Sequence, residues 1–539
     1  MKRLSQAILP AFSFALLCAQ VAFAQVTETM GQTESGAYYT IAVPDGWQTD
    51  DGLVIWNHGY QGYTQTDPEP NPSLGPLEDF VLEQGYALAA SSFSQTGWAV
   101  FSSHIDNHQL YQKFVELNGT PAKLFIQGAS MGGIVSLRDL EAGLLPQVDG
   151  SLLMCGAVSG SDNWYNAFDL RMIYEAVCDQ VSGARLPASN WYEQPLSGSG
   201  EVDFLDSLSK CVGIFPEQVL SANLADAIRS GSQTERLLQI LQLSGVSKEF
   251  LLLDLGYAVF EIPNLVNHPG KLNGARPFDN TGIDYGDEEI NLLVQRSAAL
   301  PSSRDLLLDN FTPTGNIAAS KIVSIHTSRD GLVKPENQQV LSGLVNGNQL
   351  TTAVVVESEP SHCSFSDEEG LAAWNSLRDW VGGEVQPSAA DLQQSCLDSS
   401  QDADLCRFDS GYQLGDSLLE FSRSASTASI GSNTYDSDTG MVSIESLRQT
   451  GDGTSYGVSL LPPAEDASLF SIDEIATSSG NSSWQHSATF FPEDSLLYVP
   501  GMQIMPVTPE SESFRVYMRY TSENGVEGLQ LLEYESELP

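Results

Sequence analysis

The first part of the chain alternates short apolar runs with segments in which apolar residues recur every three or four positions. Five apolar runs have the length of buried strands: 37–43, 53–57, 86–90, 123–127 and 152–156. Segments with helical spacing lie between them, at 77–84, 110–117 and 134–140. Parallel strands need such crossover helices, which also cover the sheet. The pattern predicts an α/β fold, a mostly parallel sheet with helices on both faces.

This alternation stops at about residue 161 and resumes at about 317. Strand-like runs at 321–326 and 351–356 and a closing helix at 371–381 follow, so we predict one core from 25–160 and 317–386. The intervening 161–316 has helical spacing at 222–228, 234–243 and 248–260. It is interpreted as a helical cap inserted into the sheet domain, with an independent helical domain as the alternative. Its aromatic residues are mostly expected in the core, with one or two lining an apolar acyl or aryl pocket: Trp164, Tyr165, Phe168, Tyr174, Trp191 and Tyr192.

A different pattern fills the last quarter of the chain. Residues 387–410 are polar and are predicted to be a linker. Short strands and turns follow over 411–539, where 434–444 aligns with 489–499 at an offset of 489 − 434 = 55 residues. We therefore predict a β-sandwich-like accessory domain built from two repeats of that length.

The first 24 residues have the features of a secretory signal peptide. Lys2 and Arg3 precede an apolar stretch, and Ala22-Phe-Ala24 is typical of a cleavage site. No later apolar run approaches the ~20 residues of a membrane span. We expect a protein without a transmembrane segment, secreted or periplasmic after cleavage near Ala24.

The chain is strongly acidic, with 24 Lys and Arg against 69 Asp and Glu and a net charge of −45. This balance argues against nucleic acid as a partner, because phosphate binding needs Lys and Arg. Charge that keeps the protein soluble and adaptation to high salt both remain open as explanations.

Of seven cysteines, six follow the predicted signal peptide, an even number suited to an oxidising compartment. Cys396 and Cys406 lie close together in a polar segment and are predicted to pair. Cys363 adjoins His362, so a bridge from it to Cys155 or Cys178 would fix the position of that histidine. Because the chain has no CxxC pair, we expect no zinc site, and no metal or organic cofactor.

The strand at 123–127 leads into Gly128-Ala-Ser130-Met-Gly132, and helical spacing follows at once. Strand, Gly-x-Ser-x-Gly and helix in this order are typical of a nucleophile elbow, which exposes the serine hydroxyl above the sheet. A second match surrounds Ser455, where a turn leads into a strand and no helix follows. Ser130 is therefore predicted to be a nucleophile and Ser455 a turn serine.

A nucleophilic serine needs a base and an acid that orients the base, which follow it in the order acid, histidine in this kind of fold. Asp330 comes just after the strand at 321–326. His362 follows the strand at 351–356, whereas His486 lies far off in the β-rich tail. Asp330 as a helix N-cap and His362 as an ordinary loop residue are the alternatives, but the order favours a Ser130–His362–Asp330 triad.

An acyl-transfer site also needs two backbone N–H groups for the oxyanion. One is assigned to Met131, after the nucleophile. The strand at 53–57 runs into His58-Gly-Tyr60-Gln61, so the other is assigned to Tyr60, with Gln61 as the alternative. His58 is interpreted as structural.

Several runs are similar to secreted bacterial serine hydrolases of the α/β-hydrolase superfamily: Ser35-Gly-Ala-Tyr-Tyr39, Trp56-Asn-His-Gly59, Gly85 to Ser92 with Gly97-Trp98, Gly128 to Gly133, Asn280-Thr-Gly282 with Tyr285, His326 to Val333 and His362-Cys-Ser-Phe365. The resemblance covers about residues 30–380. It departs at Ser361, where glycine is expected, a change that should alter the loop backbone rather than the chemistry.

The resemblance implies an exported carboxylic ester hydrolase whose substrate is a small ester or a polyester or polysaccharide ester. It does not fix the substrate, because this fold hosts many activities. A serine peptidase of prolyl-oligopeptidase type is the first alternative, although that family usually carries an N-terminal propeller and the accessory domain here is C-terminal. A binding or adhesion protein with an inactive hydrolase core is the second.

Overall fold

The computed structural model describes residues 26–62, 67–213, 231–280, 283–299 and 301–414, and beyond them the backbone of strands between 429 and 535. The predicted signal peptide and the predicted helix at 222–228 lie outside the described residues. Within the part of the chain that is described, no helix combines the length and apolar character needed to cross a bilayer.

One mixed sheet of eight strands, in the order β1-β2-β4-β3-β5-β6-β7-β8, forms the core of the α/β domain. Strand β2 runs antiparallel to both neighbours, and the pairs from β4 to β8 are parallel. The predicted, mostly parallel sheet is confirmed. Its strands are β1 (Val26–Gln32), β2 (Tyr38–Pro44), β3 (Gly52–Asn57), β4 (Ala87–Ser91), β5 (Lys123–Ala129), β6 (Gly150–Met154), β7 (Lys321–Thr327) and β8 (Leu350–Val355).

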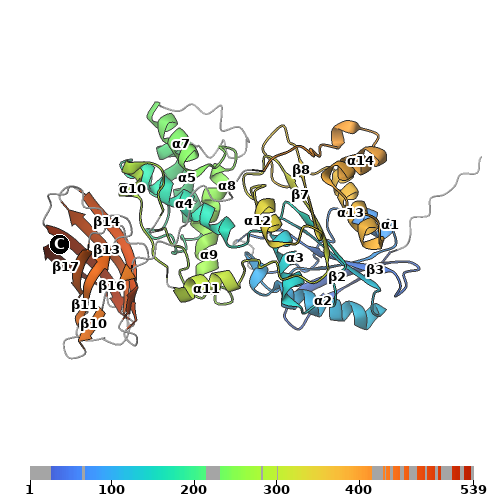
Figure 1. Cartoon of the computed structure of the whole chain (residues 1–539), viewed down its shortest axis with the longest axis horizontal. Coiled ribbons are helices and arrows are strands. Elements are labelled where there is room, and N and C mark those ends of the chain that lie inside the picture. The colour runs from blue at the N-terminus through green and yellow to red at the C-terminus, as the bar shows by residue number, and fades with distance from the viewer. Residues whose placement is uncertain are drawn as a thin grey trace, which may run out of the picture.

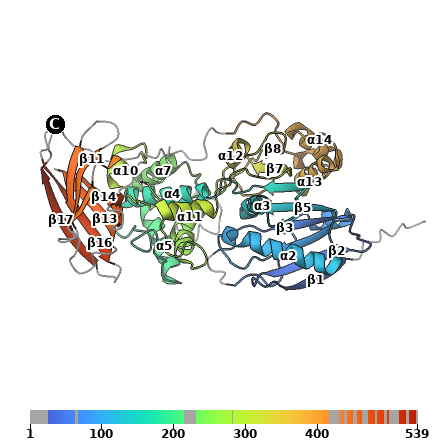
Figure 2. The same cartoon turned by 60° about the horizontal axis from the view of Figure 1, so that its bottom comes forward.

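Helices cover both faces of this sheet, as predicted (Figure 2). Successive side chains of a strand point to opposite faces. In the central strand β5, Ile126 therefore joins one apolar core and Phe125 joins the other. The first core includes α2 (Ser103–Asn118), α3 (Met131–Ala142) and α12 (Asn337–Leu344); the second includes α1 (Glu78–Glu83), α13 (Asp367–Gly382) and α14 (Ala389–Ser399).

A helical insertion lies between β6 and β7, and its helices gather on one side of the sheet domain, in green in Figure 1. Its apolar residues belong to the same buried cluster as the α2 and α3 face of the sheet. The disulfide between Cys178 and Cys211 joins two of its helices. Its elements are α4 (Asp162–Cys178), α5 (Ser199–Val212), α7 (Gly231–Ser244), α8 (Leu251–Gly256), a π-helical segment (Tyr257–Glu261), α9 (Ile262–Asn267), α10 (Glu288–Leu293) and α11 (Pro301–Asp309).

The segment predicted as a linker, 387–410, is instead part of the sheet domain. Helix α14 begins there at a capping box between Ser388 and Asp391 and packs against α13 and β8. The predicted disulfide Cys396–Cys406 is present, and Phe408 pairs with Val355 of β8. The polar composition was misleading because the helix needs only its inner face to be apolar.

The C-terminal part contains strands β9 to β17 in a four-stranded and a five-stranded sheet. Strand β12 pairs with β11, and β16 pairs with β13 and β17. The two segments that the sequence alignment matches form hairpins in the same register, because Asp436 pairs with Met441 in one and Phe491 pairs with Leu496 in the other, 55 residues further along the chain. The strands are β9 (Ser429–Ile430), β10 (Asn433–Asp436), β11 (Met441–Arg448), β12 (Ser455–Leu460), β13 (Phe470–Ser479), β14 (Ser482–Phe491), β15 (Leu496–Tyr498), β16 (Ser513–Ser522) and β17 (Glu527–Glu535).

Candidate active site

Ser130 lies at the sharp turn between β5 and α3. Its backbone has φ 56° and ψ −124°, a conformation that is rare outside glycine. The flanking glycines permit the turn, because a Cβ at Gly128 would lie 2.1 Å from the carbonyl oxygen of Gly132 and one at Gly132 would lie 2.0 Å from that of Asn57. The turn that was predicted from the sequence pattern is therefore formed, and no residue with a side chain fits two positions before or two positions after the serine.

The structure brings Ser130, His362 and Asp330 together into one chain of hydrogen bonds. The Ser130 Oγ lies 2.9 Å from Nε2 of His362, and Nδ1 of His362 lies 2.6 Å from Oδ2 of Asp330. The three residues are spread between positions 130 and 362 of the sequence, and they follow the ends of β5, β7 and β8. Because those strands are parallel, their carboxyl ends meet at the same edge of the sheet.

The Asp330 carboxylate is completely buried, whereas 21% of the His362 side chain stays accessible. Oδ1 of Asp330 accepts hydrogen bonds from the backbone N–H groups of Leu332 and Val333, at 3.1 and 3.0 Å. Burial raises the pKa of Asp330, but hydrogen bonds from His326 and His362 and their charges outweigh it and hold the pKa below its ordinary value. The group is therefore an anion at neutral pH.

A second buried histidine, His326, supports this carboxylate. Its Nε2–H donates to the carbonyl oxygen of Val333 at 2.7 Å and lies 3.6 Å from Oδ2 of Asp330. Sequence reasoning treated His326 only as the end of a strand. The signal was its spacing, because His326 precedes Asp330 by four positions, across the turn that follows β7.

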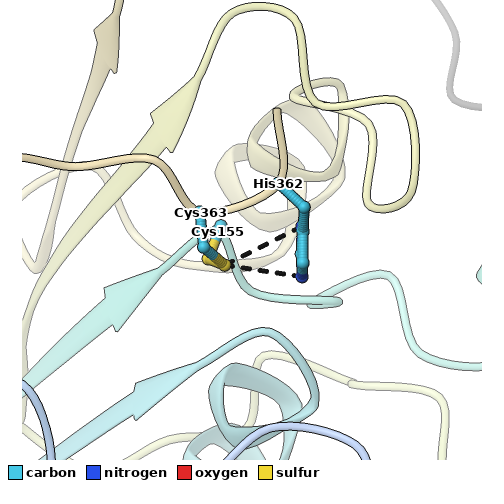
Figure 3. Close-up of side chains that lie close together, drawn as sticks. All are labelled: Cys155, His362 and Cys363. Carbon is cyan, nitrogen blue, oxygen red and sulfur yellow. Dashed lines mark hydrogen bonds between the residues drawn. A yellow bond between two sulfur atoms is a disulfide. The ribbon is translucent and has the colours of Figure 1, made fainter. Parts of the chain in front are cut away.

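The His362 loop is tied to the sheet by a disulfide between Cys363 and Cys155, which follows β6 (Figure 3). This bridge resolves the alternatives that the sequence left open. The Cys363 sulfur lies 3.4 Å from Nε2 of His362. Three residues of metal-binding types thus lie together, but the two sulfurs are bonded to each other and offer no thiolate to a metal. Cys363 takes a positive φ of 58°, whereas Ser361 does not, so the absent glycine is not required there.

The predicted oxyanion turn lies directly beside the nucleophile. A Cβ added to Gly59 would lie 3.4 Å from Cβ of Ser130 and 3.9 Å from its Oγ. Tyr60 and Met131 both line the pocket into which Ser130 faces, and Gln61 does not. The carbonyl oxygen of Gln61 accepts from the N–H of Gly97 at 2.7 Å, which fixes the end of the turn. The hydroxyl of Tyr60 donates to Oε2 of the buried Glu261 at 2.7 Å.

His58, which we interpreted as structural, is partly buried beside the ring of Phe93, with ring centroids 4.4 Å apart. Its Nδ1–H donates to the carbonyl oxygen of Gly59 at 2.7 Å. Burial lowers the pKa of His58 despite that bond. His58 makes no hydrogen bond with Ser130 in the described part of the chain.

A buried polar network lies behind the oxyanion turn. The Nδ2 of Asn107 donates to Oδ1 of Asn57 at 2.8 Å and to Oδ2 of Asp139 at 2.7 Å. The Nδ2 of Asn57 donates to Oγ of Ser136 at 3.0 Å. Burial raises the pKa of Asp139 to about 8 even though hydrogen bonds from Asn107 and Asn57 lower it. The network joins the last residue of β3 to the middle of α3, the two elements that carry the predicted oxyanion donors.

A pocket of about 70 Å³ opens beside Ser130, at the junction of the sheet domain and the helical insertion. Of the six aromatic residues singled out in the insertion, only Trp164 lines it; Phe168 and Trp191 pack with Phe278 in the core. Sequence reasoning missed the remaining aromatic lining residues, Trp98 and Tyr257, and the acidic residue Asp254. No spacing in the sequence marks them.

Ser455 is the first residue of strand β12 and pairs with Arg448 of β11. His486 lies within strand β14. The turn-then-strand order predicted around Ser455 is thus present, and no helix follows it.

No protein-family model matches the chain, and no curated protein matches its sequence. Solved structures with a similar fold include an esterase of Pyrococcus furiosus, 14% identical over 71% of this chain and 99% of that one, with a TM-score of 0.32. Another is the rice cell wall degrading esterase LipA of Xanthomonas oryzae, 12% identical over 66% of this chain and 87% of that one, with a TM-score of 0.32. A third is Candida antarctica lipase A, 12% identical over 71% of this chain and 88% of that one, with a TM-score of 0.33.

Proposed function

We propose that the chain is an exported serine hydrolase of the α/β-hydrolase type that cleaves carboxylic esters. The observation that carries this is the unbroken hydrogen-bond chain from Ser130 through His362 to Asp330, at 2.9 and 2.6 Å. Nucleophile, base and orienting acid within hydrogen-bond reach are what covalent acyl transfer by a serine requires. The three disulfides fit an oxidising compartment and hence export.

In the first half of the reaction, the Ser130 Oγ attacks the ester carbonyl carbon as its proton passes to Nε2 of His362. The Asp330 carboxylate accepts from Nδ1–H, which fixes the tautomer whose Nε2 is free to take the proton and stabilises the imidazolium that forms. His362 then protonates the leaving alcohol, and an acyl-enzyme remains on Ser130. Because part of the imidazole is open to solvent, water can reach it for the second half.

In the second half, His362 removes a proton from that water, the water attacks the acyl carbon, and Ser130 leaves with the proton returned by His362. The negative charge on the carbonyl oxygen in both halves is assigned to the N–H groups of Met131 and Tyr60. Met131 is the first residue of α3, so its N–H has no partner within the helix and the positive end of the helix dipole adds to it. Gly59 brings the Tyr60 turn against Ser130.

The test compares hydrolysis of nitrophenyl acetate and butyrate with that of aminoacyl nitroanilides by the purified chain. Ser130→Ala should lower kcat on the esters by about 10³-fold or more, and Asp330→Asn should do so through the wrong imidazole tautomer. Ser455→Ala is the matched control and should leave the rate unchanged. Equal losses from the two serine changes would refute the assignment. Faster cleavage of the anilides than of the esters would replace the esterase by a peptidase.

A further inference from the structure

An unpaired acid lies in the wall of the pocket beside Ser130. Asp254 is in helix α8 of the insertion, keeps 8% of its surface accessible, and lines the pocket together with Ser130 and Met131. Within the described residues, no hydrogen bond and no ion pair involves its carboxyl oxygens. The neighbouring charges are Lys334, which also lines the pocket and lowers the pKa of Asp254, and Asp330, which raises it.

This placement is costly unless a bound molecule completes it. A buried polar group without a partner loses its hydration and gains nothing in return. Burial accordingly raises the pKa of Asp254 well above its ordinary value, which favours the neutral acid. Most buried acids of this chain have partners; Asp169, for example, accepts from the hydroxyl of Tyr285 at 2.8 Å. Asp254 differs in that it borders the cavity where substrate must bind.

The rest of the pocket wall is aromatic. Tyr60 and Tyr257 lie with ring centroids 5.2 Å apart, Trp98 and Trp164 lie 5.4 Å apart, and Trp164 and Tyr257 lie 6.0 Å apart. These tilted and edge-on arrangements leave ring faces and edges that favour a further ring. A volume of about 70 Å³ suits a group of roughly half a dozen heavy atoms, since one water needs about 10–15 Å³.

We propose that this pocket binds a hydroxyl-bearing aromatic group of the ester and that Asp254 is the residue that recognises the hydroxyl. The aromatic wall packs against the ring, and the Asp254 carboxyl forms the hydrogen bond that it otherwise lacks. This inference rests on the proposed ester hydrolase function and names the substrate class of the same site.

Aromatic rings around a buried acid also suit a cationic group. Two observations favour the neutral phenol. Lys334 lines the same pocket, and its positive charge, which lowers the pKa of Asp254, repels a cation. A hydroxyl can both donate to Asp254 and accept from Lys334, whereas an ammonium can only donate.

The experiment uses ester pairs that differ only by a hydroxyl remote from the carbonyl, so that their intrinsic reactivities match. On the acyl arm the pair is methyl 3-(4-hydroxyphenyl)propanoate and methyl 3-phenylpropanoate; on the alcohol arm it is 2-(4-hydroxyphenyl)ethyl acetate and 2-phenylethyl acetate. In the arm whose aromatic group enters the pocket, kcat/KM should be at least about tenfold higher for the hydroxylated ester, because the analogue without the hydroxyl leaves a buried acid unpaired. Asp254→Leu should bring that ratio close to one, while Asp254→Asn should retain part of it.

Stability separates recognition from a structural role. Asp254→Leu removes an unpaired buried acid, so its melting temperature should equal or exceed that of the wild type. Asp169→Leu is the matched control, because it removes the partner of a buried tyrosine hydroxyl and should melt lower. A lower melting temperature for Asp254→Leu, with an unchanged ester ratio, would show that Asp254 serves the fold.

Binding separates the failure of this inference from that of the proposed function. Binding is measured by calorimetry on Ser130→Ala, because this variant hardly turns over. If the alcohol arm enters the pocket, the Kd should be about tenfold lower for 2-(4-hydroxyphenyl)ethanol than for 2-phenylethanol. If the acyl arm enters it, the Kd should be about tenfold lower for methyl 3-(4-hydroxyphenyl)propanoate than for methyl 3-phenylpropanoate. Active enzyme with a ratio near one in both arms overturns the inference alone. Preference for a trimethylammonium-substituted ring overturns it in favour of a cation site.

Discussion

Removal of the disulfide between Cys155 and Cys363 should lower both the stability of the fold and the activity, because the bond closes a long loop and positions His362. It closes a loop of 208 residues that contains the whole insertion, β7 and β8, and it fixes the residue next to His362. Both cysteines have left-handed backbones, with φ of 44° and 58°, which cost energy in a residue other than glycine. The double variant Cys155→Ala/Cys363→Ala frees both backbones to relax and leaves the His362 loop without its covalent anchor.

The stability effect follows from the loop length. In the chain-entropy model, closing 208 residues stabilises the fold by about 5 kcal/mol at 25 °C, against about 3 kcal/mol for the 10 residues between Cys396 and Cys406. The first figure is an upper value, since real denatured chains keep some structure. The double variant at 155 and 363 should therefore lose more stability in urea than Cys396→Ala/Cys406→Ala.

The activity effect follows from the position of the bond. Without it, His362 keeps its hydrogen bonds to Ser130 and Asp330, and the loop keeps the contact from Arg407 to the carbonyl oxygen of Ser364 at 2.7 Å. A base displaced by about 1 Å can cost up to about 100-fold in rate, so kcat on a nitrophenyl ester should fall by about 10- to 100-fold with a small change in KM. The assay is run at 10 °C, with folding confirmed by circular dichroism.

Cys396→Ala/Cys406→Ala is the control, because its disulfide joins α14 to the segment after it and touches none of the three site residues. It should lose stability and keep its kcat. If a folded Cys155→Ala/Cys363→Ala variant retains the full kcat, the disulfide does not position His362. If both double variants lose equal activity, the losses report general destabilisation, and the positional argument is wrong.

Three further changes test the buried network and the limits of the sheet domain. Burial raises the pKa of Asp139 from 3.8 to about 8 in the folded state, so the stability that its neutral form contributes is complete below about pH 4 and is lost as the pH rises towards 8. Asparagine cannot ionise, so the free energy of unfolding of Asp139→Asn should rise relative to that of the wild type by up to about 1.4 kcal/mol per pH unit in this window. Urea unfolding at several pH values measures this difference. A difference that stays constant with pH would contradict the prediction. A chain ending at Leu414 should hydrolyse small esters at the full-length rate. A chain ending at Gln386 should melt at a lower temperature, because it lacks α14 and the ion pair of Arg407 with the buried Glu369, at 2.9 Å. Inactivity of the folded chain ending at Leu414 would mean that the β-rich tail contributes to the site.

The sequence predicted the sheet and pointed to Ser130, Asp330 and His362, which the structure brings together, because both inferences depend on local patterns. A strand that is buried on both faces is a continuous apolar run, and a Gly-x-Ser-x-Gly turn needs glycine for reasons confined to a few residues, as Gly128 and Gly132 show. Parallel strands then bring their carboxyl ends together, so the chain order of Ser130, Asp330 and His362 was enough to select them from many serines, acids and histidines.

Elements at the rim of the sheet were harder to predict. Strand β1 reads Val-Thr-Glu-Thr-Met-Gly-Gln and is mostly exposed, so its alternation lacks the apolar half of a buried strand. Helix α14 has only a narrow apolar face, with Leu392 and Cys396 buried, and its polar remainder looked like a linker. In both cases the neighbouring element supplies the stabilisation, through β2 and through α13, and that contribution is not visible in the segment itself.

The pocket shows a different limit. Asp254 and Trp98 are 156 residues apart (254 − 98), in different parts of the fold, and meet only because the insertion packs on the sheet edge. In the sequence, Asp254 interrupts Leu251 to Leu255 as an acid on an otherwise apolar helix, which has the ordinary interpretation of a solvent-facing position. The structure places that position inside, and among the described residues its carboxyl has no hydrogen-bond or ion-pair partner. A sequence search can therefore look for an acid on the apolar face of a helix in an insertion that follows a nucleophile elbow. On our proposal, the substrate supplies the hydrogen-bond partner that such a buried acid lacks within the protein.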